Sequence, residues 1–167
     1  YKHVPLMESN VEQAVKNNVV GTHVVAEAAG RHRCGKFILV STDKAVRPAN
    51  VMGSTKRLAE LAVLDLQDCY PDTAFGAVRF GNVLGSRGSI LPLFRSQILK
   101  GGPVTLTDAR SRRFFMTIPE AASLVLQAGG VGETRDLYLL DMGEPVSIKD
   151  MAEQMVRFYG YEPHREI

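Results

Sequence analysis

The sequence predicts an α/β fold in which part of a doubly wound parallel sheet is followed by a smaller mixed lobe. Short apolar runs at residues 36–40 and 74–80 are typical of buried strands. A long segment with helical periodicity separates these runs, as a crossover helix does in a parallel sheet. Polar motifs directly follow both runs. Open α/β sheets bind their ligands at such strand ends, so these motifs mark the candidate functional site.

Composition narrows the class of protein. The chain has 167 residues, of which 45% are hydrophobic, enough for the core of one ordinary domain. Its formal net charge of +2 gives no sign of nucleic-acid binding, and the cluster of Arg110, Arg112 and Arg113 is better suited to a small molecule carrying phosphate. Cys34 and Cys69 lack metal or disulfide spacing, so we expect reduced thiols in the cytoplasm and no metal site.

The first helix is predicted over residues 8–29, with Ser9 or Asn10 as its N-cap and Gly30 as its end. Its apolar residues follow the stripe expected of a helix that flanks a parallel sheet. Asn18 interrupts this stripe. A buried asparagine requires hydrogen-bond partners, and a simple helix kink is the alternative at this position.

The central motif covers residues 41–56 and reads S-T-D-K-A-V-R-P-A-N-V-M-G-S-T-K. Residues 41–44 lie at the carboxyl end of the first predicted strand. A helix predicted over 51–68 follows, and Met52 and Lys56 share one face of it because they are four residues apart. The fold should therefore bring Lys56 opposite the strand end.

These residue types suggest acid–base chemistry. Asp43 and Lys44 are able to act as general acid and general base if burial and their mutual charge move their pKa values toward neutrality. Thr42 offers a hydroxyl that orients a substrate alcohol, and Lys56 offers a cation for ribose hydroxyls and a developing alkoxide. The residue types alone leave open a solvated turn with a surface lysine.

A second motif, G-N-V-L-G-S-R-G-S at residues 81–89, follows the second predicted strand. Its glycines permit the backbone to approach a ligand closely. Asn82 is suited to a diphosphate or a sugar, and Arg87 offers a fork for phosphate. A tight turn without a ligand is the alternative reading.

The rest of the chain predicts elements that complete the lobe and carry no recognisable chemistry. They are a helix over 90–100, a strand over 103–107, a helix to 128 with Thr117 and Glu120 as its capping box, a buried strand over 137–140, and a helix over 148–159 begun by Ser147 and Asp150.

The motifs S-T-D-K-A, M-G-S-T-K and V-R-F-G-N-V-L-G-S-R-G-S resemble those of the extended short-chain dehydrogenase/reductase enzymes. They look specifically like the UDP-N-acetylglucosamine 4,6-dehydratases of polysaccharide biosynthesis, and the resemblance covers nearly the whole chain. It implies a Rossmann-like sheet, NAD or NADP as cofactor and a UDP-sugar as substrate. Met52 replaces the usual tyrosine, and a thioether exchanges no proton. The dehydratase branch includes members with methionine at this position.

The resemblance implies that the enzyme oxidises C4 of the sugar, eliminates water across C5 and C6, and finally reduces C6. Lys44 would be the base at C5 and Asp43 the acid for the leaving hydroxyl. Thr42 would bind the C4 hydroxyl, Lys56 the nicotinamide ribose, and Met52 would pack beside the ring. The implied cofactor contacts are Ser41, Met52, Lys56, Val83, Leu84 and Gly85. The implied substrate contacts are Thr42, Asn82 and Arg87, with Thr105 at the uracil ring and Arg113 at the diphosphate.

The resemblance also predicts the domain organisation. Residues 1–83 would carry the sheet, its helices and the active site, and 84–167 mainly the nucleotide-sugar lobe, with residues 1–7 as a loop near cofactor and substrate. We expect a dinucleotide-binding part outside this chain, because no glycine fingerprint opens it, and little activity from these residues alone. The intact protein would be a cytoplasmic homo-oligomer, with any membrane tether lying elsewhere.

Two alternatives remain at the level of sequence. A nucleotide-sugar 4-epimerase shares cofactor and substrate but requires no acid and base for elimination, so Asp43 and Lys44 favour the dehydratase. Met52 argues against an ordinary epimerase. A non-catalytic module that binds nucleotide sugars is the alternative from another class, and Met52 together with the missing fingerprint favours it.

Overall fold

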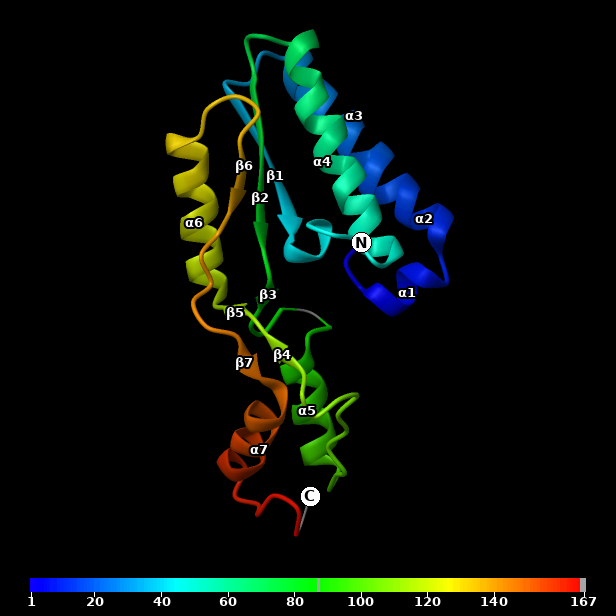
Figure 1. The fold of residues 1–167 in the computed structure, drawn as a ribbon, viewed down its shortest axis with the longest axis vertical. Coiled ribbons are helices and arrows are strands. Elements are labelled where there is room, and N and C mark those ends of the chain that lie inside the picture. Colours follow the sequence, from blue (N-terminus) through cyan, green and yellow to red (C-terminus); the bar gives the residue numbers. More distant parts are fainter. Residues whose placement is uncertain (87, 166–167) are drawn as a thin grey trace. The chain divides into compact units, whose positions relative to one another are not determined.

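The computed structural model describes residues 1–86 and 88–165, which divide into two compact units. The sheet unit comprises Tyr1–Phe80 and Ala122–Asp141. The lobe unit comprises the described residues of Gly81–Ala121 and Met142–Ile167. The segment 122–141 thus returns to the sheet unit after the chain has built most of the lobe unit (Figure 1).

The sheet unit is built on parallel strands. Among the described residues, β1 (Lys36–Thr42), β2 (Ala74–Phe80) and β6 (Leu137–Leu139) form one sheet in the order β1-β2-β6. Strands β1 and β2 pair along their whole length, ending with Thr42 beside Phe80. The carboxyl ends of the two strands therefore lie at the same edge, as predicted, and the α/β fold is confirmed.

Helices cover both faces of this sheet. Figure 1 shows α3 (Thr22–Arg31) and α4 (Val51–Cys69) on one side and α6 (Ile118–Val131) on the other. The core between the sheet and α3 and α4 consists of Ala26, Leu39, Ala59, Val63, Leu66, Phe75 and Ala77. This arrangement is that of a doubly wound sheet, in which crossover helices pack on opposite faces.

The amino-terminal helix is less regular than predicted. It begins with α2 (Val11–Val15), continues through the π-helix η1 (Lys16–Gly21) and ends with α3, whose last residue lies beyond Gly30. A preceding helix, α1 (Val4–Glu8), occupies part of the segment where a loop was predicted. Proline in its first turn suits a helix start, since the missing N–H has no partner there in any case.

Gly30 has a packing role in place of the predicted stop. A Cβ atom at this position would overlap the ring of Tyr70, which follows α4. Glycine therefore lets α3 and the end of α4 approach closely.

The lobe unit is mixed, as predicted. Strands β3 (Asn82–Val83) and β5 (Phe115–Met116) pair in parallel, whereas β4 (Arg112–Arg113) and β7 (Val146–Ser147) pair antiparallel. Helices α5 (Ile90–Leu99) and α7 (Ile148–Phe158) pack through Phe94, Ile148 and Ala152.

Local hydrogen bonds explain one wrong and two correct predictions in the carboxyl-terminal half. The strand predicted over 103–107 is absent from the described structure, because the Thr105 backbone N–H donates to the Gln97 side chain instead of to a neighbouring strand. Thr117 and Glu120 form the predicted capping box, and Ser147 caps α7.

Strand β6 was predicted to be buried, and this was wrong. Leu139 is 70% exposed because β6 lies at an edge of the sheet.

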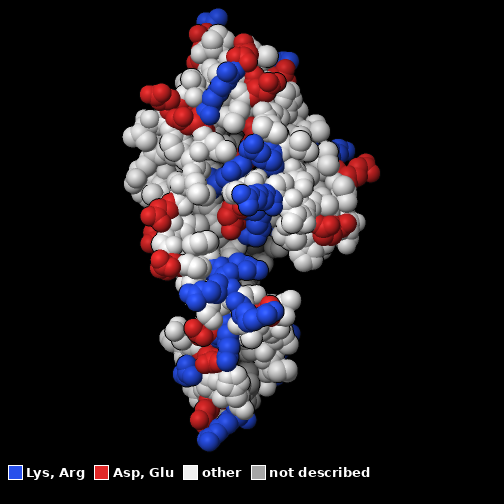
Figure 2. Space-filling model, viewed as in Figure 1, with Lys and Arg blue, Asp and Glu red and all other residues white. Residues whose placement is uncertain are grey.

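Charged side chains of both signs lie on the face of the molecule seen in Figure 2, in keeping with the small net charge of +2. In the part of the chain that the structure describes, none of the helices combines the length and the apolar character needed to cross a bilayer.

Candidate active site

The carboxyl end of β1 carries three polar side chains in direct contact, which we call the Thr-Asp-Lys cluster (Thr42, Asp43 and Lys44). The strand ends at Thr42, and the single 3₁₀ turn η2 (Asp43–Ala45) follows. The Thr42 hydroxyl and the Lys44 ammonium both donate to Asp43 Oδ1, each at 2.9 Å. The side chains of Asp43 and Lys44 are 32% and 30% exposed. A carboxylate thus lies between a hydroxyl and an ammonium where solvent or a substrate reaches it.

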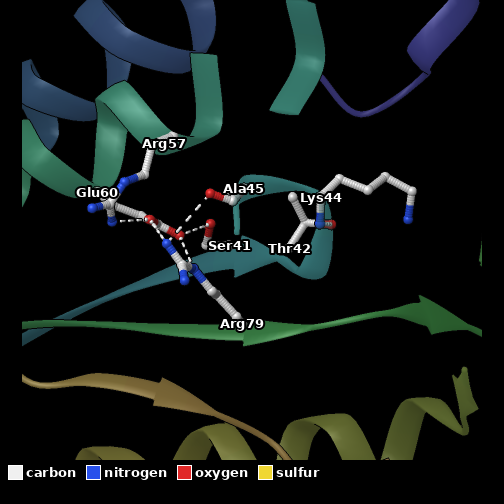
Figure 3. Close-up of polar contacts among 7 residues, drawn as sticks. All are labelled: Ser41, Thr42, Lys44, Ala45, Arg57, Glu60 and Arg79. Atoms are coloured by element: carbon white, nitrogen blue, oxygen red, sulfur yellow. Dashed lines mark hydrogen bonds and ion pairs between the residues drawn. The ribbon is translucent and has the colours of Figure 1, made fainter. Parts of the chain in front are cut away.

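Beneath this cluster is a buried ion pair that the sequence analysis missed. The carboxylate of Glu60, on α4, is fully buried and accepts from Arg79 Nε at 2.8 Å and Arg79 Nη2 at 2.5 Å. The Ser41 hydroxyl donates to it at 2.5 Å and Arg57 at 3.0 Å (Figure 3). Ser41 was predicted to contact the cofactor, and its side chain is engaged with Glu60.

The electrostatics of Glu60 follow from these contacts. Burial alone raises the pKa of a carboxyl group, but hydrogen bonds from Arg79, Ser41 and Arg57 outweigh burial and hold the pKa of Glu60 below its ordinary 4.5. One signal in the sequence pointed to such a pair. Arg79 interrupts an otherwise apolar strand, and a charge buried in a strand requires a partner.

Helix α4 packs directly on the turn that carries the cluster. The Asn50 side chain caps the helix by accepting from the Gly53 N–H at 2.8 Å. A Cβ atom at Gly53 would overlap the carbonyl oxygen of Lys44. Only glycine therefore allows this approach, which explains the glycine of the M-G-S-T-K motif.

Lys56 reaches from α4 to β1, as predicted. Its ammonium donates to the Val40 carbonyl at 3.0 Å, two residues before Thr42. Burial lowers the pKa of Lys56 from its ordinary 10.5, and the charge of Glu60 opposes this effect. The helix cation thus lies at the strand end.

Met52 and Asn18 are both buried. Met52 is 3% exposed and packs against Met7 and Ala14 in a small apolar cluster. Asn18 lies in the π-helix and donates to the Thr55 hydroxyl at 3.1 Å, so the buried asparagine has a partner on α4. The contact of Met52 with a nicotinamide ring stays a prediction.

In the lobe unit, the predicted ligand residues begin at β3. The backbone N–H of Asn82 donates to the Phe114 carbonyl at 3.1 Å, and that of Leu84 donates to the Met116 carbonyl at 2.8 Å. Val83 completes β3, and Gly85 follows with a φ of +70° that suits glycine. Arg87 lies outside the described residues.

The side chains of Thr105 and Arg113 each form a hydrogen bond within the lobe unit. The Thr105 hydroxyl accepts from Gln97 at 2.7 Å, and the exposed Arg113 guanidinium donates to the Arg112 carbonyl at 2.8 Å. Their contacts with uracil and diphosphate stay predictions.

Comparison with known proteins identifies the family. All 167 residues match the model of a family described as "Polysaccharide biosynthesis protein". The chain is 57% identical over 161 residues to the probable polysaccharide biosynthesis protein EpsC of Bacillus subtilis. It is 54% identical over 160 residues to the capsular polysaccharide biosynthesis protein CapD of Staphylococcus aureus. Each match covers 96% of this chain and 27% of the relative, so the chain spans about a quarter of these proteins.

Further matches include a relative named as a UDP-glucose 4-epimerase and a solved structure. A UDP-glucose 4-epimerase of Rickettsia canadensis is 39% identical over 140 residues, covering 83% of this chain and 41% of the relative. The X-ray structure of Pen from Bacillus thuringiensis superimposes with a TM-score of 0.89 at 33% identity, covering 99% of this chain and 54% of that one.

The fold of DesIV, a dTDP-glucose 4,6-dehydratase from Streptomyces venezuelae solved with NAD, gives a TM-score of 0.88 at 18% identity, covering 97% of this chain and 56% of that one. This similarity confirms the Rossmann-like fold, since at such low identity only the fold is compared. Because the family model matches the whole chain, the chain belongs to the polysaccharide biosynthesis protein family.

Proposed function

We propose that the intact protein is a UDP-N-acetylglucosamine 4,6-dehydratase that makes precursors of a surface polysaccharide or glycan. The observation that carries this proposal is the Thr-Asp-Lys cluster, in which Asp43 accepts from Thr42 and Lys44 at the carboxyl end of β1. Elimination of water requires an acid and a base held close together, and this cluster provides both. The names of EpsC and CapD support a role in polysaccharide biosynthesis. The relative named as a UDP-glucose 4-epimerase supports a UDP-sugar as substrate.

The residues present fit a nicotinamide cofactor, either NAD or NADP. An ammonium has three N–H donors, and Lys56 uses one of them for the Val40 carbonyl at 3.0 Å. The donor chemistry of Lys56 therefore suits ribose hydroxyls beside the strand end. Ser41, Met52, Val83, Leu84 and Gly85 are proposed as further contacts. When bound, the nicotinamide would supply the hydride chemistry of the reaction, with a hydride taken up from C4 of the sugar and returned to C6 after water has left.

Thr42 binds the C4 hydroxyl in the proposed mechanism, and the oxidised C4 makes the proton at C5 more acidic. Lys44 takes this proton as a neutral amine, while Asp43 as a neutral acid donates a proton to the C6 hydroxyl, which leaves as water. With substrate bound, one proton passed from Lys44 to Asp43 across their 2.9 Å contact would give the required amine and acid, and the elimination returns both groups to their ionised forms.

The proposed substrate contacts in the lobe are Asn82, Arg87, Thr105 and Arg113. An amide, a hydroxyl and two guanidinium groups match the hydrogen-bonding needs of a diphosphate and a uracil. We also propose that the intact protein is a cytoplasmic homo-oligomer, with any membrane tether in a separate segment.

A 4-epimerase is the second candidate, because a relative that is 39% identical carries this name. Both reactions start with oxidation at C4, but an epimerase needs no acid and base for elimination. The contact between Asp43 and Lys44 is therefore the feature that favours the dehydratase.

Mass spectrometry of UDP-N-acetylglucosamine after incubation with the intact gene product tests the proposal. The dehydratase predicts a product lighter by one water. A product of unchanged mass with the C4 epimer present would establish the epimerase instead. A sugar that binds but stays unchanged would show a non-catalytic binding module and overturn the proposal.

A further inference from the structure

We propose that Glu60 is a positioning residue that fixes the Thr-Asp-Lys cluster at both of its ends, directly at Ser41 and through Arg79 at Ala45. This inference rests on the proposed function for its effect on turnover, whereas its structural content concerns the sheet unit alone.

The contacts of Glu60 connect three elements. Its carboxylate accepts from Ser41 of β1, from Arg79 of β2 and from Arg57 of its own helix α4. Arg79 Nη2 also reaches the carbonyl of Ala45, the last residue of η2, at 3.5 Å. Figure 3 shows these groups converging on one side of the turn, while the Lys44 side chain points away from them.

The two anchored residues flank the cluster directly. Ser41 precedes Thr42, and Ala45 follows Lys44. Both flanking residues are buried, at 5% and 0% exposed, whereas the polar side chains between them are partly open. The segment is therefore held at its ends to α4, the helix that also carries Lys56. Fixing the acid and the base relative to Lys56 matters because a shift of about 1 Å lowers turnover on the order of 10²-fold.

A stability role alone would not require charges at this place. Replacing a buried ion pair by well-packed apolar residues is often neutral or stabilising, whereas removing one partner leaves an uncompensated charge. The Glu60→Leu/Arg79→Met double variant exploits this difference. It fills the same space without leaving a buried charge, but it loses the hydrogen bonds to Ser41 and Ala45.

The test uses the intact protein and three variants. They are Glu60→Gln, the double variant, and Glu27→Gln as the matched control, which alters an exposed pair with Arg31 on α3. Hydrogen–deuterium exchange of the peptide covering 41–46, melting temperature, and kcat and KM for UDP-N-acetylglucosamine are measured for each.

Positioning predicts faster exchange in 41–46 and kcat lowered about 10²-fold, with KM within about threefold, in both Glu60 variants. The double variant should show this even with a melting temperature within about 4 °C of wild type. The control should match wild type throughout. A stable double variant with normal exchange and normal kcat would overturn the proposal.

If the double variant does not fold, hydrogen–deuterium exchange of the Glu60→Gln variant tests the proposal. Normal protection of residues 41–46 in that variant would also overturn it. Failure of the proposed function would look different. Wild-type protein would then form no dehydrated sugar, while exchange would still report whether Glu60 holds the segment.

Discussion

Asp43 is the residue at the centre of the proposed acid–base chemistry. Its Oδ1 atom accepts from both Thr42 and Lys44, and one third of the side chain remains open. The gathering of these three side chains was predictable from the sequence because the residues are adjacent and follow a predicted strand. The burial of Glu60 was not, because its partners Ser41 and Arg79 are each 19 residues away in the chain.

Replacing Asp43 by asparagine keeps its shape but removes the proton that Asp43 donates to the C6 hydroxyl in the proposed mechanism. We expect water loss to slow on the order of 10²–10⁴-fold, the usual contribution of general acid catalysis. Mass spectrometry of the product over time measures the rate. Asp72→Asn is the matched control, since Asp72 is 70% exposed and its ion pair with Arg33 is long at 3.9 Å. Equal rates for the two variants would exclude Asp43 as the acid.

The charge of Glu60 predicts a specific dependence of stability on pH. Its pKa in the folded state lies below the ordinary 4.5, so the unfolded chain binds more protons at this site between the two values. The stabilisation by Glu60 is therefore complete above about pH 4.5 and is lost as pH falls through the depressed value. Urea denaturation of wild type and Glu60→Gln from pH 3 to pH 7 checks this. We expect their difference in unfolding free energy to be constant at the upper end and to shrink in acid. A difference independent of pH would contradict the assignment.

Helix α4 organises the site because it approaches the turn without a side chain between them. A Cβ atom at Gly53 would overlap the Lys44 carbonyl oxygen. We expect Gly53→Ala to destabilise the protein by about 1–3 kcal/mol, as overpacking does, and to lower kcat by displacing Lys44.

Gly21→Ala is the matched control for this prediction. A Cβ atom at Gly21 would make an ordinary 3.6 Å contact with the Lys16 carbonyl, within a helical backbone. Alanine should therefore stabilise that helix by about 0.5–1 kcal/mol and leave kcat unchanged. Denaturation curves and turnover of both variants check the pair. A Gly53→Ala variant as stable and active as Gly21→Ala would show that neither stability nor turnover depends on the close approach of α4 to the Lys44 carbonyl.

Secondary structure was predictable where periodicity and capping signals agree. The first two strands and α4 form at the predicted positions, although β1 extends to Thr42 and the capping of α4 by Asn50 was not predicted. Helix α1 and the π-helix were not predicted, because their conformation depends on packing against α4. Asn18 forms a hydrogen bond with Thr55 of α4, and Met7 packs against Met52. The pairing of Thr105 with Gln97 likewise replaced a predicted strand with a side-chain contact.

The chain as a whole consists of a sheet unit and a lobe unit, and the sheet unit is discontinuous in sequence. The sequence pattern predicted a parallel sheet followed by a mixed lobe. The return of 122–141 to the sheet unit could not be predicted from local patterns, because β6 pairs with β2 some 60 residues earlier in the chain (Ala77 with Leu137). The predicted acid, base and Lys56 all belong to the sheet unit, so the proposed chemistry is concentrated there.

The most direct test of the proposed dehydratase is incubation of UDP-N-acetylglucosamine in heavy water with the intact protein, either wild type or Lys44→Ala. The exposed Lys100→Ala is the control. In the proposed mechanism Lys44 takes the C5 proton, so wild type and control should yield a sugar that has lost one water and gained one deuterium at C5. Lys44→Ala should yield neither change. Water loss with deuterium uptake at a normal rate in Lys44→Ala would contradict the assignment of the base and the role proposed for the Thr-Asp-Lys cluster.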